Sequence, residues 1–180
     1  MNKKIRHKYL KSLGLNELQI HGKLERADFE EVFSKNFESI WILHDDASLL
    51  AEVTSELQHV KAIRYCPFES QDISWINKLV NLEFIYLEGP MKGVIDFDNF
   101  KSAKEVDVDL CKSTNSILTA SISPEFLGLT KLKGDLADLS SSLLKNVRSL
   151  SLTSPTMSSL DGLSSFSKLT YLSLERCLKL

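Results

Sequence analysis

The sequence predicts an α/β solenoid of about eight short parallel strands on a concave face, joined by short helices, 3₁₀ turns and loops on a convex face. Three observations predict this fold. Apolar residues recur in the pattern L-x-x-L-x-L, and this pattern returns at intervals of 18 to 26 residues that average 22. The composition, with 43% hydrophobic and 26% charged residues, is that of a globular domain with a continuous core.

The most regular repeat lies at the C-terminal end of the sequence. Residues 169–177 read Leu-Thr-Tyr-Leu-Ser-Leu-Glu-Arg-Cys, which agrees with the pattern L-x-x-L-x-L-x-x-N/C at every fixed position. Moving the same template toward the N-terminus finds seven further units. The eight units begin at Leu15, Phe37, Val60, Leu82, Ala103, Leu129, Val147 and Leu169.

The sixth unit is the least regular of the eight. It reads Leu129-x-x-Leu132-x-Gly134, so a glycine occupies a position where a core leucine or valine is expected. The intervals of 26 and 18 residues fall on either side of this unit, whereas the other intervals are 21 to 23 residues. The pattern therefore leaves the register of the sixth unit open.

Eight units in nearly constant phase resemble the leucine-rich-repeat family, in particular its short 22-residue class and the irregular repeats of bacterial type. The resemblance covers residues 15–180 and implies parallel strands that line a curved inner face. The position that usually holds Asn departs from the family in most units, which predicts irregular turns. This position holds Lys23, Asp45, Phe68, Pro90, Cys111, Ala137, Pro155 and Cys177.

Three of the segments between the strands carry apolar residues at helical spacing, namely residues 27–33, 45–57 and 70–79. We expect helices there, and Asp45 or Asp46 is available as the N-cap of the second one. Residues 1–14 are basic and contain few apolar side chains. Because a solenoid needs a polar cap at its end, this segment is expected to form a small helical cap before the first strand.

Side chains alternate along a strand, so the residue between the two core positions of each unit is expected on the concave face. In chain order these residues are Gln19, Trp41, Arg64, Tyr86, Asp107, Lys133, Ser151 and Ser173. Five consecutive members of this column, from the second unit to the sixth, are aromatic or charged. The column therefore indicates where a ligand would bind.

We predict a partner-binding site with two parts on this face. The aromatic centre, on units two to four, is rich in the residue types most enriched at binding hot spots. It consists of Trp41, Leu43, Arg64, Phe84 and Tyr86. The acidic edge, on units four and five and next to Lys133, consists of Glu88, Glu105, Asp107 and Asp109.

The acidic edge favours a partner with a basic surface, because like charges on neighbouring strands disfavour one another and only Arg64 is expected close enough to offset them. Both parts of the site have a simpler structural explanation. Trp41, Phe84 and Tyr86 would then pack under a loop or an N-terminal cap. The acidic residues would then form an ordinary solvated face.

The sequence favours a non-catalytic protein–protein interaction module that binds another protein on its concave face. An immunity or inhibitor protein that neutralises a toxin or enzyme is an alternative, since the acidic edge suits a basic cleft. No cofactor is expected, because the motifs G-x-x-x-x-G-K-[ST], G-x-G-x-x-G and G-x-S-x-G are all missing. No metal is expected either, and a cysteine-dependent enzyme that uses Cys66 is the disfavoured third reading.

Charge and targeting signals indicate a cytoplasmic protein. The net charge of -2 is too small to favour nucleic acid as a ligand. No stretch approaches the roughly 18 apolar residues that a membrane span needs, and residues 1–14 lack the apolar run of a secretory signal. The three cysteines, an odd number without C-x-x-C spacing, are expected to be reduced thiols.

The last repeat ends at residues 177–180 without a capping segment behind it. An uncapped repeat leaves a strand edge and an apolar face in water. The sequence therefore predicts either a truncated chain or a last repeat that another subunit covers. In the second case, the strand at 169–175 would pair with the same strand of a symmetry mate in a homodimer.

Overall fold

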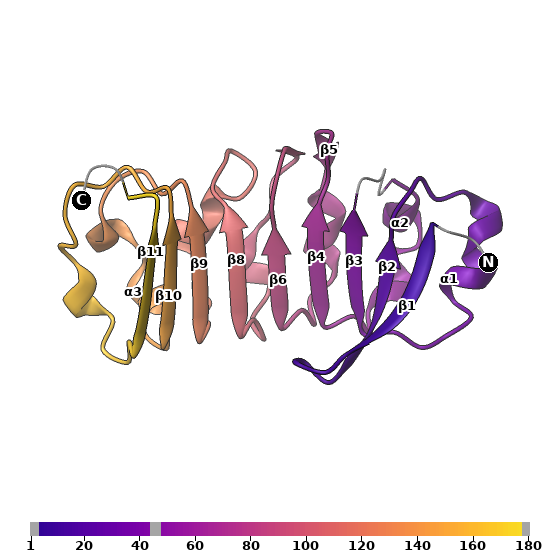
Figure 1. Cartoon of the computed structure of the whole chain (residues 1–180), viewed down its shortest axis with the longest axis horizontal. Helices are drawn as coiled ribbons and strands as arrows, with labels where there is room; N and C mark the ends of the chain where they lie inside the picture. Colours follow the sequence, from indigo (N-terminus) through magenta and orange to yellow (C-terminus); the bar gives the residue numbers. More distant parts are fainter. Residues whose placement is uncertain (1–3, 44–47, 178–180) are drawn as a thin grey trace.

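The computed structural model describes residues 4–43 and 48–177. Its main element is a nine-stranded sheet in which the strands follow one another in chain order (Figure 1). The first pair is antiparallel and the seven other pairs are parallel, so the fold is a mixed α/β structure with a mostly parallel sheet. The strands are β1 Ile5–Leu10, β2 Leu15–Ile20, β3 Ser39–Leu43, β4 Ala62–Cys66, β6 Phe84–Leu87, β8 Glu105–Asp109, β9 Phe126–Thr130, β10 Ser149–Thr153 and β11 Tyr171–Glu175.

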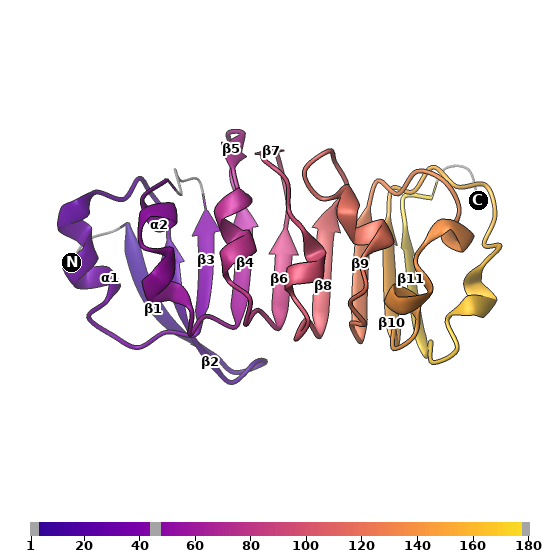
Figure 2. The same ribbon diagram turned by 180° about the vertical axis from the view of Figure 1, so that it is seen from behind.

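Short helical turns cover one face of this sheet, as the view from behind shows (Figure 2). They are η1 Arg26–Asp28, α1 Phe29–Val32, α2 Ser48–Glu52, η2 Thr54–Leu57, η3 Ser74–Lys78, η4 Phe97–Asn99, η5 Asn115–Thr119, η6 Leu136–Asp138, α3 Ser141–Leu144 and η7 Leu163–Ser165, where η marks a 3₁₀ turn. Two short strands, β5 Gln71–Asp72 and β7 Met91–Lys92, pair with each other beyond the C-terminal ends of β4 and β6. Within the described residues, no helix has the length and apolar character that crossing a membrane requires.

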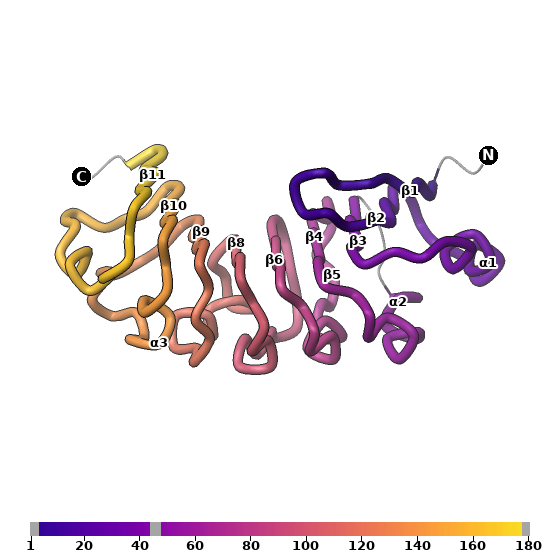
Figure 3. The backbone as a smooth tube through the Cα atoms, turned by 90° about the horizontal axis from the view of Figure 1, so that it is seen from below, coloured from indigo at the N-terminus to yellow at the C-terminus, as the bar shows by residue number. Residues whose placement is uncertain are grey.

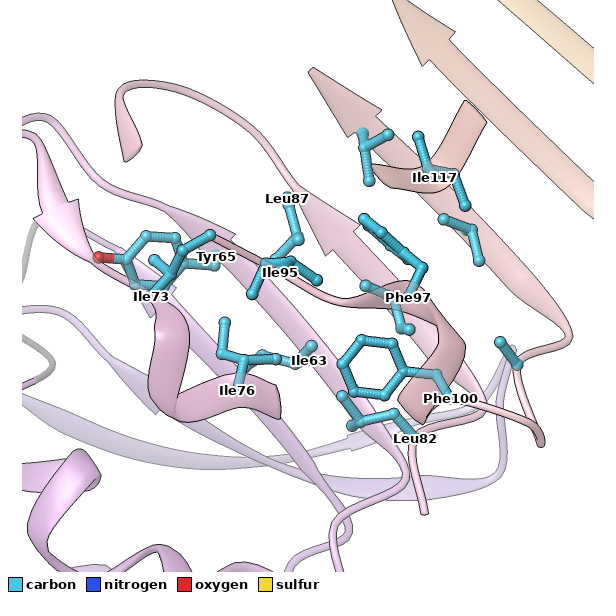
Figure 4. Close-up of a cluster of buried hydrophobic side chains, with 14 of the residues drawn as sticks. Ile63, Tyr65, Ile73, Ile76, Leu82, Leu87, Ile95, Phe97, Phe100 and Ile117 are labelled. Carbon is cyan, nitrogen blue, oxygen red and sulfur yellow. The ribbon is translucent and has the colours of Figure 1, made fainter. Parts of the chain in front are cut away.

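The hydrophobic core lies between the sheet and the connecting turns. Every second side chain of the parallel strands points into it, and Ile40, Ile63 and Ile85 occupy the same register with no exposed surface. The connecting turns form the other side of the core. In Figure 4, Phe97 and Phe100 of the connection between β6 and β8 lie near Leu82 and Ile95. Their ring centroids are 5.9 Å apart in an edge-to-face arrangement.

The predicted helix at 45–57 is two short turns, α2 and η2. The Thr54 hydroxyl donates to the Ala51 carbonyl at 2.8 Å, and such a bond competes with the regular backbone pattern of a helix. The helix therefore ends before the predicted boundary. Asp45 and Asp46, the expected N-cap residues, lie outside the described residues.

The two other predicted helices are also shorter than expected. Residues 27–33 form η1 and α1, while residues 70–79 form β5 and η3. Each connection must return beneath the sheet while the chain advances by one strand spacing, about 4.8 Å. A single helical turn covers that distance. The apolar spacing in these segments therefore indicates which residues are buried, but it does not indicate a long helix.

The sixth strand lies earlier in the chain than the sequence predicted. Within β9, Leu127 and Leu129 occupy the core positions, in register with Val106 and Val108 of β8. The predicted register is wrong because Leu132, which follows the strand, is also buried and so satisfies the leucine pattern. With the sixth unit beginning at position 124, the intervals around it become 21 and 23 residues.

This shift corrects two predicted positions. Gly134 has φ of 93° and belongs to a turn, so it does not replace a core leucine. Gly128 takes the inner-face position that the sequence assigned to Lys133. Lys133 is exposed and lines a separate hollow with Cys111, so its predicted place in the inner-face row is wrong.

The N-terminal cap is a β-hairpin and not a small helix. β1 pairs antiparallel with β2 through a turn that ends at Gly14, whose φ of 69° lies in the left-handed region that glycine adopts readily. Seen from below, the sheet forms an arc, and the hairpin extends across its inner side (Figure 3). Consistent with this cover, Glu17, Ser39 and Ala62 have no exposed surface although they occupy inner-face positions.

Candidate binding surface on the inner face of the sheet

The central row of the inner face follows directly from strand register. Trp41 of β3, Arg64 of β4, Tyr86 of β6 and Asp107 of β8 are register partners in consecutive strands, and Gly128 of β9 continues the row. Their neighbours along each strand are core residues, so alternation directs these side chains to the opposite side. The sequence correctly placed the first four in one row.

Arg64 lies between two aromatic rings. Its guanidinium carbon is 4.6 Å from the ring centroid of Trp41 and 5.7 Å from that of Tyr86. Both distances fall within the range of cation–π attraction, which contributes about 0.5–1 kcal/mol per contact at exposed sites. Within the described part of the chain, Arg64 forms no hydrogen bond or ion pair. Its position is thus fixed by the rings, and its N–H groups have no protein acceptor there.

Tyr86 is held from its other end by Glu105. The phenol donates a hydrogen bond of 2.6 Å to Oε2 of Glu105. Burial of the phenol raises its pKa well above the ordinary value, and the bond to Glu105 adds to this effect. The ring is therefore a neutral, oriented surface at neutral pH, and Glu105 is engaged with the protein itself.

The acidic edge is partly neutralised by a residue that the sequence analysis did not include. Nζ of Lys131 lies 3.0 Å from Oδ2 of Asp109. Lys131 follows β9 and has φ of 65°, a conformation that turns the chain at the end of the strand. The expectation that only Arg64 is close enough to offset the acidic residues is therefore wrong.

Asp107 differs from Asp109 in having no such partner among the described residues. Its carboxylate is half-buried and lies over Gly128, where a Cβ atom on that residue would collide with Oδ1. Burial raises the pKa of Asp107, and the nearby charges of Glu88 and Asp109 raise it further. The free protein therefore holds this charge in an unfavourable environment that a ligand cation would relieve.

These residues surround a hollow of about 580 Å³ on the inner face, which we call the inner-face hollow. Its charged lining contains three cationic and three anionic side chains: Arg64, Lys131, Arg176, Glu88, Asp107 and Asp109. Small polar residues of β10, such as Ser151 and Thr153, also line the hollow. The predicted site did not include the two rim cations Lys131 and Arg176, which follow the ends of β9 and β11.

The remaining predicted residues are dispersed. Phe84 lines a second cleft of about 490 Å³ together with Phe126 and with Leu13 of the turn between β1 and β2. Glu105 also lines this second cleft. Leu43 is half-buried at the end of β3 and lines neither space.

Cys66 lines the inner-face hollow as a thiol. Burial raises its pKa to about 11, with a further contribution from the charge of Glu88. The thiol donates to Oε2 of Glu88 at 3.8 Å, a contact that favours the protonated form. A nucleophilic cysteine needs the opposite environment, since the thiolate is the reactive species. Among the residues whose positions are described, no group of three His, Cys, Asp or Glu side chains has a metal-binding arrangement.

Comparison with known proteins does not identify a relative. No protein-family model matches the chain, and no curated protein has significant sequence similarity to it. The function of the inner-face hollow is therefore inferred from its own residues and geometry.

Proposed function

We propose that this protein is a leucine-rich-repeat solenoid that acts as a non-catalytic protein–protein interaction module and binds its partner on the inner face. The observation that carries this proposal is the stack of Trp41, Arg64 and Tyr86 beside a hollow of about 580 Å³. Tryptophan, arginine and tyrosine are the residue types most enriched at interface hot spots. Here all three are half-buried and held in fixed positions before any partner binds.

The repeat character of the proposal is supported by strand spacing. With the corrected sixth unit, every interval between successive units is 21 to 23 residues, within the range of leucine-rich repeats. Sequential parallel strands with a shared core agree with the way such repeats stack on their neighbours. A cytoplasmic location belongs to the same proposal, because Cys66, Cys111 and Cys177 are all free thiols.

An immunity or inhibitor role is a more specific version of this proposal, in which the partner is a toxin or an enzyme. The observation that favours it is the acidic pair formed by exposed Glu88 and half-buried Asp107 in the inner-face hollow. Such a group would complement a basic active-site cleft. A cysteine-dependent enzyme is disfavoured, because the raised pKa of Cys66 keeps its thiol protonated at neutral pH.

Replacing Trp41 and Tyr86 together by alanine is expected to weaken partner binding about 1000-fold, since each hot-spot side chain contributes about 2 kcal/mol or more. The partner is first captured from a lysate of the source cells and identified, and affinity is then measured with both purified proteins. The matched control replaces Tyr9 and Phe68, which are 57% and 72% exposed and lie outside the inner-face hollow. Unchanged affinity in the Trp41/Tyr86 double variant, with its fold intact by circular dichroism, would contradict the proposal.

Edge pairing through β11 is the second part of the proposal. Leu174, in a core-facing position, is 39% exposed, whereas the equivalent Leu152 of β10 is fully buried. In an antiparallel pair of β11 strands centred on Ser173, Leu172 of each copy would lie opposite Leu174 of the other. Light scattering at high micromolar concentration should therefore give twice the monomer mass of 20.3 kDa, and Leu174→Lys should restore the monomer. A monomeric wild-type protein under these conditions would rule out the pairing.

A further inference from the structure

The inner-face hollow contains a cation and an anion that do not neutralise each other. Arg64 and Asp107 stand on β4 and β8 with Tyr86 of β6 between them in the same row. Two strand spacings separate their backbones, about 10 Å. Neither side chain forms a hydrogen bond or ion pair with any residue that the structure describes.

The aromatic stack restricts how Arg64 can be used. Its guanidinium carbon lies 4.6 Å and 5.7 Å from the ring centroids of Trp41 and Tyr86, and its N–H groups have no acceptor among the described residues. A guanidinium edge presents parallel N–H groups that match the two oxygens of a carboxylate. The preferred ligand group at this position is therefore a carboxylate that enters from the inner-face hollow.

The environment of Asp107 favours a positively charged ligand group. Its half-buried carboxylate adjoins Glu88 and Asp109, and the rim cation Lys131 is engaged by Asp109. A ligand ammonium or guanidinium group would offset the repulsion that the free protein contains. Arg64 does not supply this positive charge, because its side chain is held between the rings of Trp41 and Tyr86.

We infer that the inner-face hollow recognises a partner segment that carries an acidic and a basic side chain about 10 Å apart, the acid contacting Arg64 and the base contacting Asp107. This inference rests on the proposed protein-binding function and specifies the chemistry of the partner. Three cations and three anions line the hollow, so a segment of mixed charge is matched better than a purely basic one. A hollow of about 580 Å³ accommodates two side chains of this size.

Short blocked peptides test this inference without the natural partner. The mixed probe contains glutamate and lysine separated by two glycines, a spacing of about 10 Å in an extended chain. Two analogues replace either the glutamate or the lysine by glutamine. Binding to the ¹⁵N-labelled full chain is followed by amide chemical shifts. We expect the mixed peptide to bind about 10-fold more tightly than either analogue, since a charge-assisted hydrogen bond contributes on the order of 1.5 kcal/mol.

Variants assign each charge of the peptide to its contact. Arg64→Gln should remove the advantage conferred by the glutamate, and Asp107→Asn should remove the advantage conferred by the lysine. Lys133→Gln is the matched control, because this exposed lysine lies outside the inner-face hollow and should leave binding unchanged. Equal binding of all three peptides would overturn the inference, as would a loss in Lys133→Gln equal to the loss in Arg64→Gln.

Failure of this inference can be distinguished from failure of the proposed function. If the three peptides bind equally while the Trp41/Tyr86 double variant still loses its partner, mixed-charge recognition is wrong and protein binding stands. If the double variant keeps its partner, the proposed function is wrong whatever the peptides do. Selective binding of the mixed peptide, removed by Arg64→Gln and Asp107→Asn, supports the inference.

Discussion

Replacing Phe97 by alanine is expected to lower the free energy of unfolding by about 3–5 kcal/mol, the usual cost of removing a large aromatic side chain from a packed core. Phe97 has no exposed surface and packs edge to face against Phe100 between the sheet and η4. Deleting the ring removes apolar burial and leaves a cavity beside Leu87 and Ile95 (Figure 4). Urea unfolding followed by circular dichroism measures the change.

The matched control for this experiment is Phe68→Ala. Phe68 is 72% exposed, so its removal should change the free energy of unfolding by about 0.5 kcal/mol or less. The comparison keeps the chemical change constant and varies only burial. Similar losses in the two variants would contradict the burial of Phe97 as the cause of the effect.

Replacing Gly162 by alanine is expected to cost about 3 kcal/mol of stability, through two effects that add. Gly162 has φ of 91°, and a non-glycine residue in left-handed backbone costs roughly 1–2 kcal/mol. In addition, an added Cβ would lie 2.5 Å from the backbone nitrogen of Ala137 in η6. Because backbone atoms cannot rotate away as a flexible side chain can, the contact between Gly162 and η6 must open.

Gly134 provides the control, because its φ of 93° is nearly the same. The nearest atom to a Cβ there is the carboxylate oxygen of Asp138 at 3.3 Å, which belongs to a movable side chain. Gly134→Ala should therefore cost only the backbone component, about 1–2 kcal/mol. Thermal unfolding of both variants measures the difference. Equal losses would mean that the approach to Ala137 has no energetic consequence.

The strand ladder was predictable from sequence because its signal is local and repeated. Ile40, Ile63 and Ile85 stand at the same place in successive units, and burial of such side chains fixes which face of each strand meets the core. The alternate positions then follow, which is why the row from Trp41 to Asp107 was found correctly. The sixth unit failed for the same reason, since Leu132 is buried without belonging to the strand.

The features that the sequence did not reveal depend on contacts between distant residues. The hairpin cap is an example, because the segment 5–10 becomes a strand only through pairing with β2. The ion pair between Asp109 and Lys131 joins residues 22 positions apart and relies on a left-handed lysine after β9. Neither the pairing nor the backbone conformation has a signature within a single repeat.

Alternation along β3, β4, β6 and β8 has a consequence for how this protein can evolve. The residues that face the inner-face hollow are different from those that fill the core, although they are neighbours in the chain. Selection can therefore exchange Arg64, Tyr86 or Asp107 for other side chains while the aliphatic ladder beneath them stays unchanged. New specificities should be accessible through single substitutions, and a library randomised at these three positions should yield folded proteins at high frequency.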